Sequence, residues 1–351
     1  MAPKLKKILS ALFIVLSVAV VVCIAFSNPE LSDAWGALRR LDAGWIAGLF
    51  GCWAAYAFFD ALGTWICLRK QGFRLTLRYV CGFTLVGFFY SSITPGASGG
   101  QAMEVNSMRR AGVPVGNGTS AVTVRLVFNQ FMISALSLGF WLFNRGFVSR
   151  QLGAAVWFVR VGWVINFAVV PLVLLAAFRR SLVRKLAFGL IGLLAKIRLV
   201  KNREALQDKV TGVLDTYHAA VYGLLSSPGQ ILLQCLCSTL SLLGLTGSMV
   251  FVYHAFGMSG VPWYHVLTLS LLLFVSASYT PLPGAGGAQE GGFMYYFNGV
   301  FTGGTKGLAL LVWRFFTYYL FLFVGIVAVL AEKVRRPRSH PDRTEVEPHD
   351  E

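Results

Sequence analysis

Long apolar stretches recur along this chain and predict its architecture. A helix needs about 20 predominantly apolar residues to cross a bilayer, and six stretches are long enough. They are Ile8–Phe26, Gly44–Leu68, Gly118–Phe143, Gln151–Phe178, Gln230–Phe256 and Thr305–Ala331. The pattern therefore predicts an all-α polytopic membrane protein with six full spans.

Two further apolar regions, Tyr79–Ala111 and Trp263–Val300, are each interrupted by proline and glycine. The interruptions read Thr94-Pro95-Gly96-Ala97-Ser98-Gly99-Gly100 and Pro281-Leu282-Pro283-Gly284-Ala285-Gly286-Gly287. Broken backbone at membrane depth is tolerated only where protein buries it or water reaches it. Similar breaks in corresponding halves of a chain are the best sequence indication of a transporter's substrate site.

The basic loops predict how these regions lie in the membrane. Arg69–Arg78, Arg179–Lys209 and Lys333–Arg338 are rich in lysine and arginine, so all three are expected in the cytoplasm. They can share one side only if each interrupted region enters and leaves on the same face. We therefore expect two re-entrant helical hairpins, the first from the cytoplasm and the second from outside. The halves then form an inverted repeat with both termini cytoplasmic.

The ends of the chain and one internal segment complete the predicted organisation. Three lysines precede the first apolar stretch and no small-x-small cleavage site follows it, so we expect an uncleaved first helix. Leucines recur at helical spacing within residues 179–229, which predicts an amphipathic segment on the inner leaflet. This segment belongs to a transmembrane domain at 1–335. Residues 336–351 are rich in proline and charge and are expected to form a disordered tail.

Composition agrees with the membrane class and excludes others. The 351 residues are 56% hydrophobic and only 13% charged, which is typical of polytopic membrane proteins. The net charge of +16 lies beside apolar spans, so lipid headgroups explain it and nucleic-acid binding is not expected. All six cysteines fall in apolar spans without a histidine at metal-ligand spacing. No Gly-Lys-Ser/Thr motif follows the glycines, so we expect neither metal, nucleotide nor other cofactor.

At its two interruptions the chain resembles the membrane domain of lysylphosphatidylglycerol synthases, a family of flippase-like proteins. The resemblance extends from the first helix to Ala331 and includes the spacing of the spans. It implies translocation of a lipid across the cytoplasmic membrane of a bacterium or archaeon. Family members often place glutamate directly after the first Gly-Gly, whereas here Gln101 stands there and Glu104 follows one turn later. Only a short segment follows Ala331, so we expect no soluble aminoacyl-transferase domain.

Three acidic residues fall within the predicted membrane-embedded stretches, and each needs a compensating partner. Asp60, in the second span, either forms a structural bond to a neighbouring helix or to a half-helix N-terminus, or it is a proton-coupling or substrate-contacting group. Glu104 and Glu290 follow the two breaks in the first turns of short helices. There they could simply complement the helix macrodipole. Alternatively they are proton sites or counter-ions to Arg125 and Arg314.

Arg125 and Arg314 are the predicted ligands of a headgroup phosphate, because guanidinium binds phosphate in a bidentate fork and stays charged. The alternative is that each arginine forms a buried ion pair with the glutamate of the same half. The two roles are compatible if the ion pair opens when a phosphate competes for the arginine. Backbone N–H groups of the breaks are expected to add donors for an anion, at Gly99, Gly100, Gly286 and Gly287. Asn129, Gln130 and Asn166 are expected to form interhelical hydrogen bonds.

These observations favour a lipid translocase over an enzyme. Its expected substrate is an anionic or modified phospholipid, or a lipid-linked headgroup, moved between leaflets. One alternative is a membrane-embedded lipid-modifying transferase, although the sequence has neither an Asp-x-Asp motif nor a histidine cluster. Another is an accessory subunit of a separately encoded aminoacyl-phosphatidylglycerol synthase. Beyond membrane lipids, the partners considered are that synthase and a second copy of the chain.

Overall fold

The computed structural model describes residues 41–179, 203–302 and 304–334, with a few isolated residues near 36–39 and 181–189. Every regular element within these ranges is helical, and five helices are long and apolar enough to cross a membrane. They coincide with five of the predicted spans. The sixth, Ile8–Phe26, and the tail 336–351 lie outside the described residues, so the total number of spans and the side of each terminus stay predictions.

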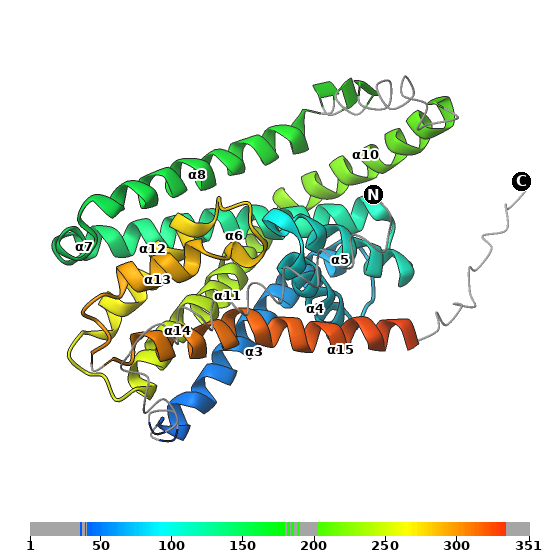
Figure 1. Cartoon of the computed structure of the whole chain (residues 1–351). Coiled ribbons are helices and arrows are strands. Elements are labelled where there is room, and N and C mark those ends of the chain that lie inside the picture. Colours follow the sequence, from blue (N-terminus) through cyan, green and yellow to red (C-terminus); the bar gives the residue numbers. More distant parts are fainter. Residues whose placement is uncertain are drawn as a thin grey trace, which may run out of the picture.

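Four of the long helices are α3 (Ala43–Lys70), α6 (Val115–Phe143), α8 (Val156–Phe178) and α11 (Pro228–Ala255) (Figure 1). Local signals fix where some of them begin. Asp42 caps α3, its Oδ1 accepting from the N–H of Gly44 at 2.7 Å, and Pro228 takes the first position of α11, where a missing N–H costs nothing. α3 and α11 pack along each other over much of their length.

The predicted span that begins at Gln151 is divided in the structure. A short helix α7 (Arg145–Leu152) and a 3₁₀ turn η3 (Gly153–Ala155) precede α8. The division falls at Gly153, which has φ +49°, a conformation that a regular helix does not contain. The regular part of this span therefore starts at Val156 rather than Gln151.

The last long helix is interrupted by a π-helical segment that the sequence did not predict. α14 (Lys306–Arg314) continues through η5 (Phe315–Tyr319) into α15 (Leu320–Val334) as one rod along the edge of the bundle (Figure 1). Such π-helical insertions frequently mark functional positions in helices. This one begins directly after Arg314.

The two interrupted regions form helical hairpins. In the first, α4 (Leu77–Ile93) leads through η2 (Pro95–Ala97) into α5 (Ser98–Arg110), which packs back against α4. In the second, α12 (Trp263–Ala277) leads through η4 (Pro283–Ala285) into α13 (Ala288–Tyr296), which packs back against α12. All four helices are shorter than the roughly 20 residues that a full crossing needs.

The hairpins approach each other from opposite ends of the α14–α15 rod. Near the open end of the first, Ser107 Oγ donates to Glu332 on the last turns of α15 at 2.9 Å. At the open end of the second, Lys306 at the start of α14 donates to Asn298 Oδ1 at 2.9 Å. The tips meet between them, where the N–H of Gly96 donates to the carbonyl of Pro281 at 2.9 Å. Which membrane face each hairpin enters from stays a prediction.

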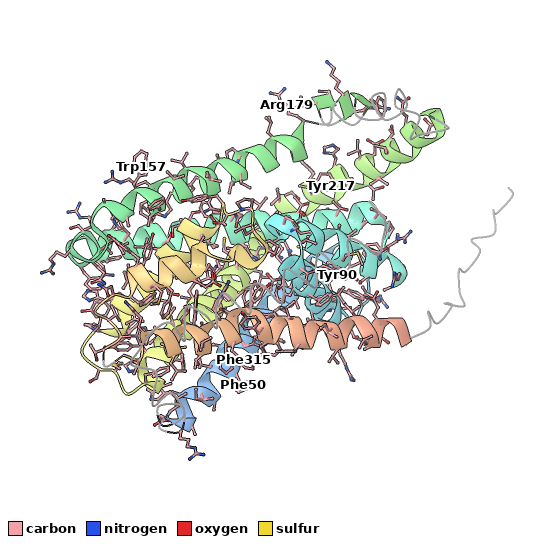
Figure 2. All side chains as sticks on the ribbon, viewed as in Figure 1. Phe50, Tyr90, Trp157, Arg179, Tyr217 and Phe315 are labelled. Carbon is pink, nitrogen blue, oxygen red and sulfur yellow. The ribbon has the colours of Figure 1, made fainter. Side chains whose placement is uncertain are left out.

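Each hairpin has its own apolar core. Phe293 and Phe297 of the second hairpin are buried with Trp313 of α14, and Val80 and Met108 of the first are buried in a separate cluster. Large apolar side chains also cover the outside of the bundle. Figure 2 shows Phe50, Trp157 and Phe315 on the outer surface, and their exposed fractions are 49%, 64% and 40%. An apolar exterior of this extent suits contact with lipid rather than water.

The predicted amphipathic segment contains α10 (Arg203–Leu225), which packs against α6 and contributes Val221 and Leu224 to the core around the first hairpin. The part of the segment before residue 203 lies largely outside the described residues. Location on a leaflet surface stays a prediction.

Candidate functional site

The two breaks share the conformation of one Gly-Ala pair and then diverge, because Ser98 continues into a helix with ψ −23° whereas Gly286 has ψ 140°. Gly96 and Gly284 have φ +58° and +60°, and the alanines that follow, Ala97 and Ala285, have φ +55° and +50°. These alanines are the only non-glycine residues with positive φ among those that the structure describes. A left-handed conformation costs a residue with a Cβ about 1–2 kcal/mol, so both halves maintain the same strained turn.

Behind the first break, a buried cluster surrounds Arg125 of α6. Its Nη1 and Nη2 donate to the two oxygens of Glu104 on α5 at 2.7 and 2.6 Å, a bidentate pair. Nη1 also donates to Thr64 Oγ1 of α3 at 2.7 Å and lies 3.2 Å from Asp60 Oδ2. Thr84 of α4 donates to Glu104 Oε1 at 3.2 Å. The cluster therefore joins α3, α4, α5 and α6.

This first cluster contains two carboxylates and one guanidinium. The exposed fractions of Asp60, Glu104 and Arg125 are 4%, 2% and 8%. Asp60 receives one further hydrogen bond, from Asn129 Nδ2 to Oδ1 at 2.9 Å. When every member is ionised, the first cluster carries a net charge of −1 inside an apolar bundle.

Behind the second break, Arg314 is bonded to the break itself. Its Nε donates to Glu290 Oε1 at 2.6 Å and its Nη1 to Gln289 Oε1 at 2.9 Å, while Nη2 donates to the carbonyl of Gly284 at 3.1 Å. The other oxygen of Glu290 accepts from the N–H of Gly287 at 2.6 Å. Arg314 and Glu290 are 4% and 2% exposed. This second cluster is electrically balanced.

Tyr318, in the π-helical segment, contacts both hairpins. The Arg314 guanidinium lies 5.1 Å from its ring centroid, within the range of a cation–π contact. A Cβ on Gly284 would overlap the same ring, and the φ of this glycine is +60°, so any side chain here would be strained. The Tyr318 hydroxyl donates to the carbonyl of Ser92, in the last turn of α4, at 3.0 Å. One side chain thus holds the tip of the second hairpin against the first.

The structure gives the four predicted glycines local roles. The N–H groups of Gly99 and Gly286 donate to Thr94 Oγ1 at 2.9 Å and to the Pro283 carbonyl at 3.1 Å. That of Gly287 is held by Glu290, as described above. A Cβ on Gly100 would lie 2.6 Å from the carbonyl oxygen of Gly87, so this glycine permits the close approach of α5 to α4. Their contact with a substrate stays a prediction.

The predicted interhelical hydrogen bonds are confirmed. Asn129 bonds to Asp60 across α6 and α3. Gln130 Nε2 donates to Asn166 Oδ1 at 2.6 Å, and Asn166 Nδ2 donates to Ser278 Oγ at 2.8 Å. The counter-ion alternative for the two glutamates agrees with the structure, because Glu104 pairs with Arg125 and Glu290 pairs with Arg314.

Sequence reasoning missed four side chains at these clusters, namely Thr64, Thr84, Gln289 and Tyr318. A signal existed for two of them. Thr64 lies four residues after Asp60 and therefore on the same helix face. Gln289 follows Pro283 by six residues, as Gln101 follows Pro95. The contacts of Thr84 and Tyr318 depend on how distant helices pack, and no local pattern indicates them.

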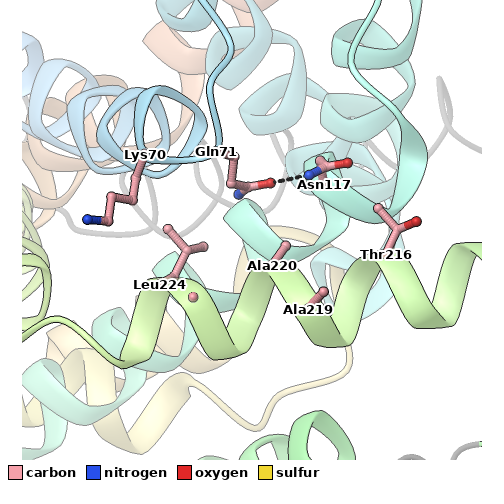
Figure 3. Close-up of a pocket in the computed structure, with 8 residues that line it drawn as sticks. Lys70, Gln71, Asn117, Thr216, Ala219, Ala220 and Leu224 are labelled. Carbon is pink, nitrogen blue, oxygen red and sulfur yellow. Dashed lines mark hydrogen bonds between the residues drawn. The ribbon is translucent and has the colours of Figure 1, made fainter. Parts of the chain in front are cut away.

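A separate cavity of about 340 Å³ opens where α10 crosses the end of α3 and the start of α6 (Figure 3). Lys70, Gln71, Asn117 and Thr216 line it, and Asn117 Nδ2 donates to Gln71 Oε1 at 2.7 Å. Lys70 is ten residues beyond Asp60 on α3, about 15 Å along the helix, so the cavity is distinct from both clusters. Within the described ranges, no three His, Cys, Asp or Glu side chains are close enough together to hold a metal ion.

An apolar helical bundle that buries paired charges behind two helix breaks defines a multi-pass integral membrane protein. The family described as "Lysylphosphatidylglycerol synthase TM region" matches residues 8–325, and the chain belongs to this family. The chain is also similar to a protein of Archaeoglobus fulgidus named "UPF0104 membrane protein". The two are 24% identical over 319 residues, which is 90% of this chain and 94% of the relative.

Proposed function

We propose that this protein is a lipid translocase that moves a phospholipid or lipid-linked headgroup between leaflets. One observation carries the proposal: two opposed helical hairpins meet at their broken tips, and each break is backed by a buried arginine. A lipid flips only if its polar headgroup crosses the apolar layer in contact with polar groups, while its acyl chains stay in lipid. Broken backbone with a buried cation behind it supplies such a polar route.

The arginines are proposed to bind the headgroup phosphate in competition with their glutamates. Arg125 already forms a bidentate pair with Glu104, the geometry in which guanidinium also binds phosphate. A phosphate that replaces the carboxylate on Arg125 or Arg314 keeps the cation paired, so no buried arginine is left without a counter-charge. The glutamates would thus occupy the positions on the arginines that the phosphate takes during transport.

The tips are proposed to be the moving parts. In the structure they are held together by the Gly96–Pro281 and Tyr318–Ser92 hydrogen bonds. Each such bond contributes only about 0.5–1.5 kcal/mol net, so neither bond by itself would keep the tips closed. Opening of one hairpin exposes Arg125 to one leaflet and opening of the other exposes Arg314 to the opposite leaflet.

The family supports a lipid as the substrate class, because its description refers to lysylphosphatidylglycerol synthase. We propose an anionic or aminoacyl-modified phospholipid, since both retain the phosphate that the arginines would bind. Location in the cytoplasmic membrane of a bacterium or archaeon belongs to the same proposal. We also propose that the protein has no enzymatic activity.

Reconstitution tests this function. The purified protein is placed in vesicles that contain a phospholipid with a fluorophore on one acyl chain, and an impermeant reductant bleaches the outer leaflet. We expect inner-leaflet label to become accessible much faster than in protein-free vesicles. Removing a bidentate phosphate contact of about 1.4 kcal/mol or more slows transport at least about tenfold, so Arg125→Ala and Arg314→Ala should both be slow.

The matched control is Arg160→Ala, which removes an exposed arginine of α8 and should leave the rate unchanged. Each variant is first shown to be folded by gel filtration in detergent. Bleaching no faster than in protein-free vesicles would contradict the translocase. Equal rates in wild type, Arg125→Ala and Arg314→Ala would contradict the site.

A further inference from the structure

The charges of the two clusters differ by one, and this difference points to a second ligand. In the second cluster one carboxylate faces one guanidinium. In the first, Asp60 and Glu104 share Arg125, and no other lysine or arginine among the described residues forms an ion pair with either carboxylate. An unbalanced charge buried in an apolar bundle is unfavourable enough that such groups are neutralised instead. One added positive charge would therefore neutralise the first cluster.

Hydrogen bonding identifies Asp60 as the group that takes this charge. Both oxygens of Glu104 accept short bonds from Arg125, at 2.7 and 2.6 Å. Asp60 reaches Arg125 only at 3.2 Å, through an Nη1 that already donates to Glu104 and Thr64. It is the least well paired carboxylate of the three buried ones.

Two buried polar groups near the level of Asp60, on Asn129 and Ser238, have atoms without a hydrogen-bond partner. The Oδ1 of Asn129 is buried without a hydrogen-bond partner, although its Nδ2 donates to Asp60. A turn of this amide would offer a carbonyl to a protonated Asp60 in place of the N–H that it offers to the ionised form. The hydroxyl of Ser238, on α11, is 2% exposed and also has no partner.

The register of α11 on α3 places Ser238 at the level of Asp60. Gln234 Nε2 donates to the carbonyl of Gly63 at 2.8 Å, and Ser241 Oγ donates to the carbonyl of Tyr56 at 3.1 Å. Ser238 lies between these two contacts on α11, as Asp60 lies between them on α3. An unpartnered buried hydroxyl therefore lies on α11 at the level of the carboxylate that lacks full pairing.

We propose that Asp60 binds an exchangeable proton and that the protein transports this proton together with an anionic headgroup. The inference rests on the proposed lipid translocation and adds its driving force. A proton, unlike a larger cation, needs no cavity of its own. It comes from water on one side of the membrane, forms an O–H bond on the Asp60 carboxylate, and is released to water on the other side.

Electrostatics couple the two ligands. With Asp60 ionised, the cluster already carries −1, so a phosphate that approaches Arg125 is repelled. With Asp60 protonated, the cluster is neutral and the phosphate binds more easily. Binding linkage is reciprocal, so the bound anion also favours the proton, and the two travel in the same direction. A lipid of charge −1 with one proton is electroneutral, so each pH unit across the membrane sets a limiting accumulation of about tenfold.

Asp60 is the exchanging group among the titratable and charged side chains that surround it. Arg125 faces it from α6 and Glu104 from α5, Cys237 lies near it on α11, and Tyr56 precedes it by one turn on α3. α4 contributes the non-titrating Thr84, through Glu104. Arg125 stays charged at any physiological pH, and both oxygens of Glu104 are bonded to it.

The test uses the full-length protein in vesicles with a fluorescent-tailed anionic phospholipid outside and a pH-sensitive dye inside. With the outside more acidic by about one pH unit, wild type should accumulate the lipid in the inner leaflet up to about tenfold, and the interior should acidify with it. With the gradient reversed, the lipid should accumulate in the outer leaflet. Asp60→Asn, which fixes the neutral form with nearly the same shape, should equilibrate the lipid without accumulation or acidification.

The control is Asp215→Asn, which removes an exposed carboxylate of α10 and should behave as wild type. If Asp60→Asn fails to fold, proton coupling is tested by wild type alone, through the interior acidification that accompanies lipid movement. Lipid movement that ignores the pH gradient in wild type, or follows a sodium gradient instead, overturns proton coupling and leaves the translocase standing. No lipid movement at all, with or without a gradient, overturns the proposed function itself.

Discussion

The two hairpin breaks share one turn and differ in what is bonded behind it. Gly96-Ala97 and Gly284-Ala285 have matching φ angles. Arg314, however, donates to its own break at the Gly284 carbonyl, whereas Arg125 donates to Glu104 and Thr64. The reason lies in spacing. Glu290 is seven residues after Pro283 and caps its own loop, whereas Glu104 is nine residues after Pro95 and reaches α6 instead.

Because of this difference, we propose different tasks for the two clusters. The second cluster is balanced, and its arginine and glutamate hold the break through the Gly284 carbonyl and the Gly287 N–H. The first has a carboxylate in excess, and its break is instead capped by Thr94, whose Oγ1 accepts from Gly99. The proton exchange that we propose at Asp60 would therefore leave the hydrogen bond that caps this break intact.

The largest expected effect is that of Arg125→Ala. It removes the only cation that the structure shows beside Asp60 and Glu104, and breaking a buried pair in this way costs about 3–5 kcal/mol. Thermal and chemical unfolding in detergent measure the loss. Adding Asp60→Asn to Arg125→Ala should restore part of it, because one of the stranded charges is gone. Neutral surface changes alter the free energy of unfolding by about 0.5 kcal/mol or less. A loss no larger than this in Arg125→Ala would contradict the ion pairs of the first cluster.

A second effect compares the two glutamates directly. Glu290→Gln leaves Arg314 without a carboxylate, whereas after Glu104→Gln the neighbouring Asp60 still faces Arg125. The loss of a charged hydrogen-bonded partner costs about 1.5–3 kcal/mol, and we expect Glu290→Gln to fall at the upper end and Glu104→Gln at the lower. Unfolding under identical detergent conditions measures both. The reverse order would mean that the excess carboxylate does not compensate.

A third, smaller effect concerns the contact between the halves. Tyr318→Phe keeps the ring against Arg314 and Gly284 but removes the hydrogen bond to Ser92, a loss of about 0.5–1.5 kcal/mol. If separation of the tips limits turnover, lipid movement in vesicles becomes faster. Tyr295→Phe, on the outer part of α13 at 53% exposure, serves as the matched control. A slower Tyr318→Phe would indicate that the hydroxyl acts in binding rather than in closure.

The smallest effect tests the shared turn itself. Replacing Ala97 or Ala285 by glycine relieves the positive φ but adds freedom to the unfolded chain, so the net gain is expected at about 0.5 kcal/mol for each. Calorimetry of the two single variants compares them. Equal gains in stability would support a turn that the two breaks share. Changes of opposite sign would show that the two breaks are not equivalent.

Much of this architecture follows from the sequence, because span length and helix breakers are local signals. Five of the predicted spans coincide with long helices, and both interruptions fall where Pro95 and Pro283 predicted them. Pairing of each arginine with its own glutamate was also among the alternatives, since buried charges at similar depth must find each other.

The rest depends on contacts between distant segments. The meeting of Gly96 with Pro281, the sharing of Arg125 by two carboxylates, and the reach of Tyr318 across the hairpins are set by helix register, which no local pattern encodes. The π-helical segment after Arg314 was missed for a similar reason. Its sequence Phe315-Phe316-Thr317-Tyr318-Tyr319 contains neither proline nor glycine, so nothing in it signals an interruption.

Cross-linking of the hairpin tips tests the central claim most directly. Ser98 and Leu282 are exposed and flank the Gly96–Pro281 contact, so cysteines there lie no more than about 16 Å apart. They are introduced into a protein whose six native cysteines are replaced, and a reducible bismaleimide joins them in vesicles. We predict that joining the tips lowers lipid movement to the protein-free level and that reduction restores it. Lipid movement at the same rate in the joined and the reduced protein would contradict translocation between the hairpins.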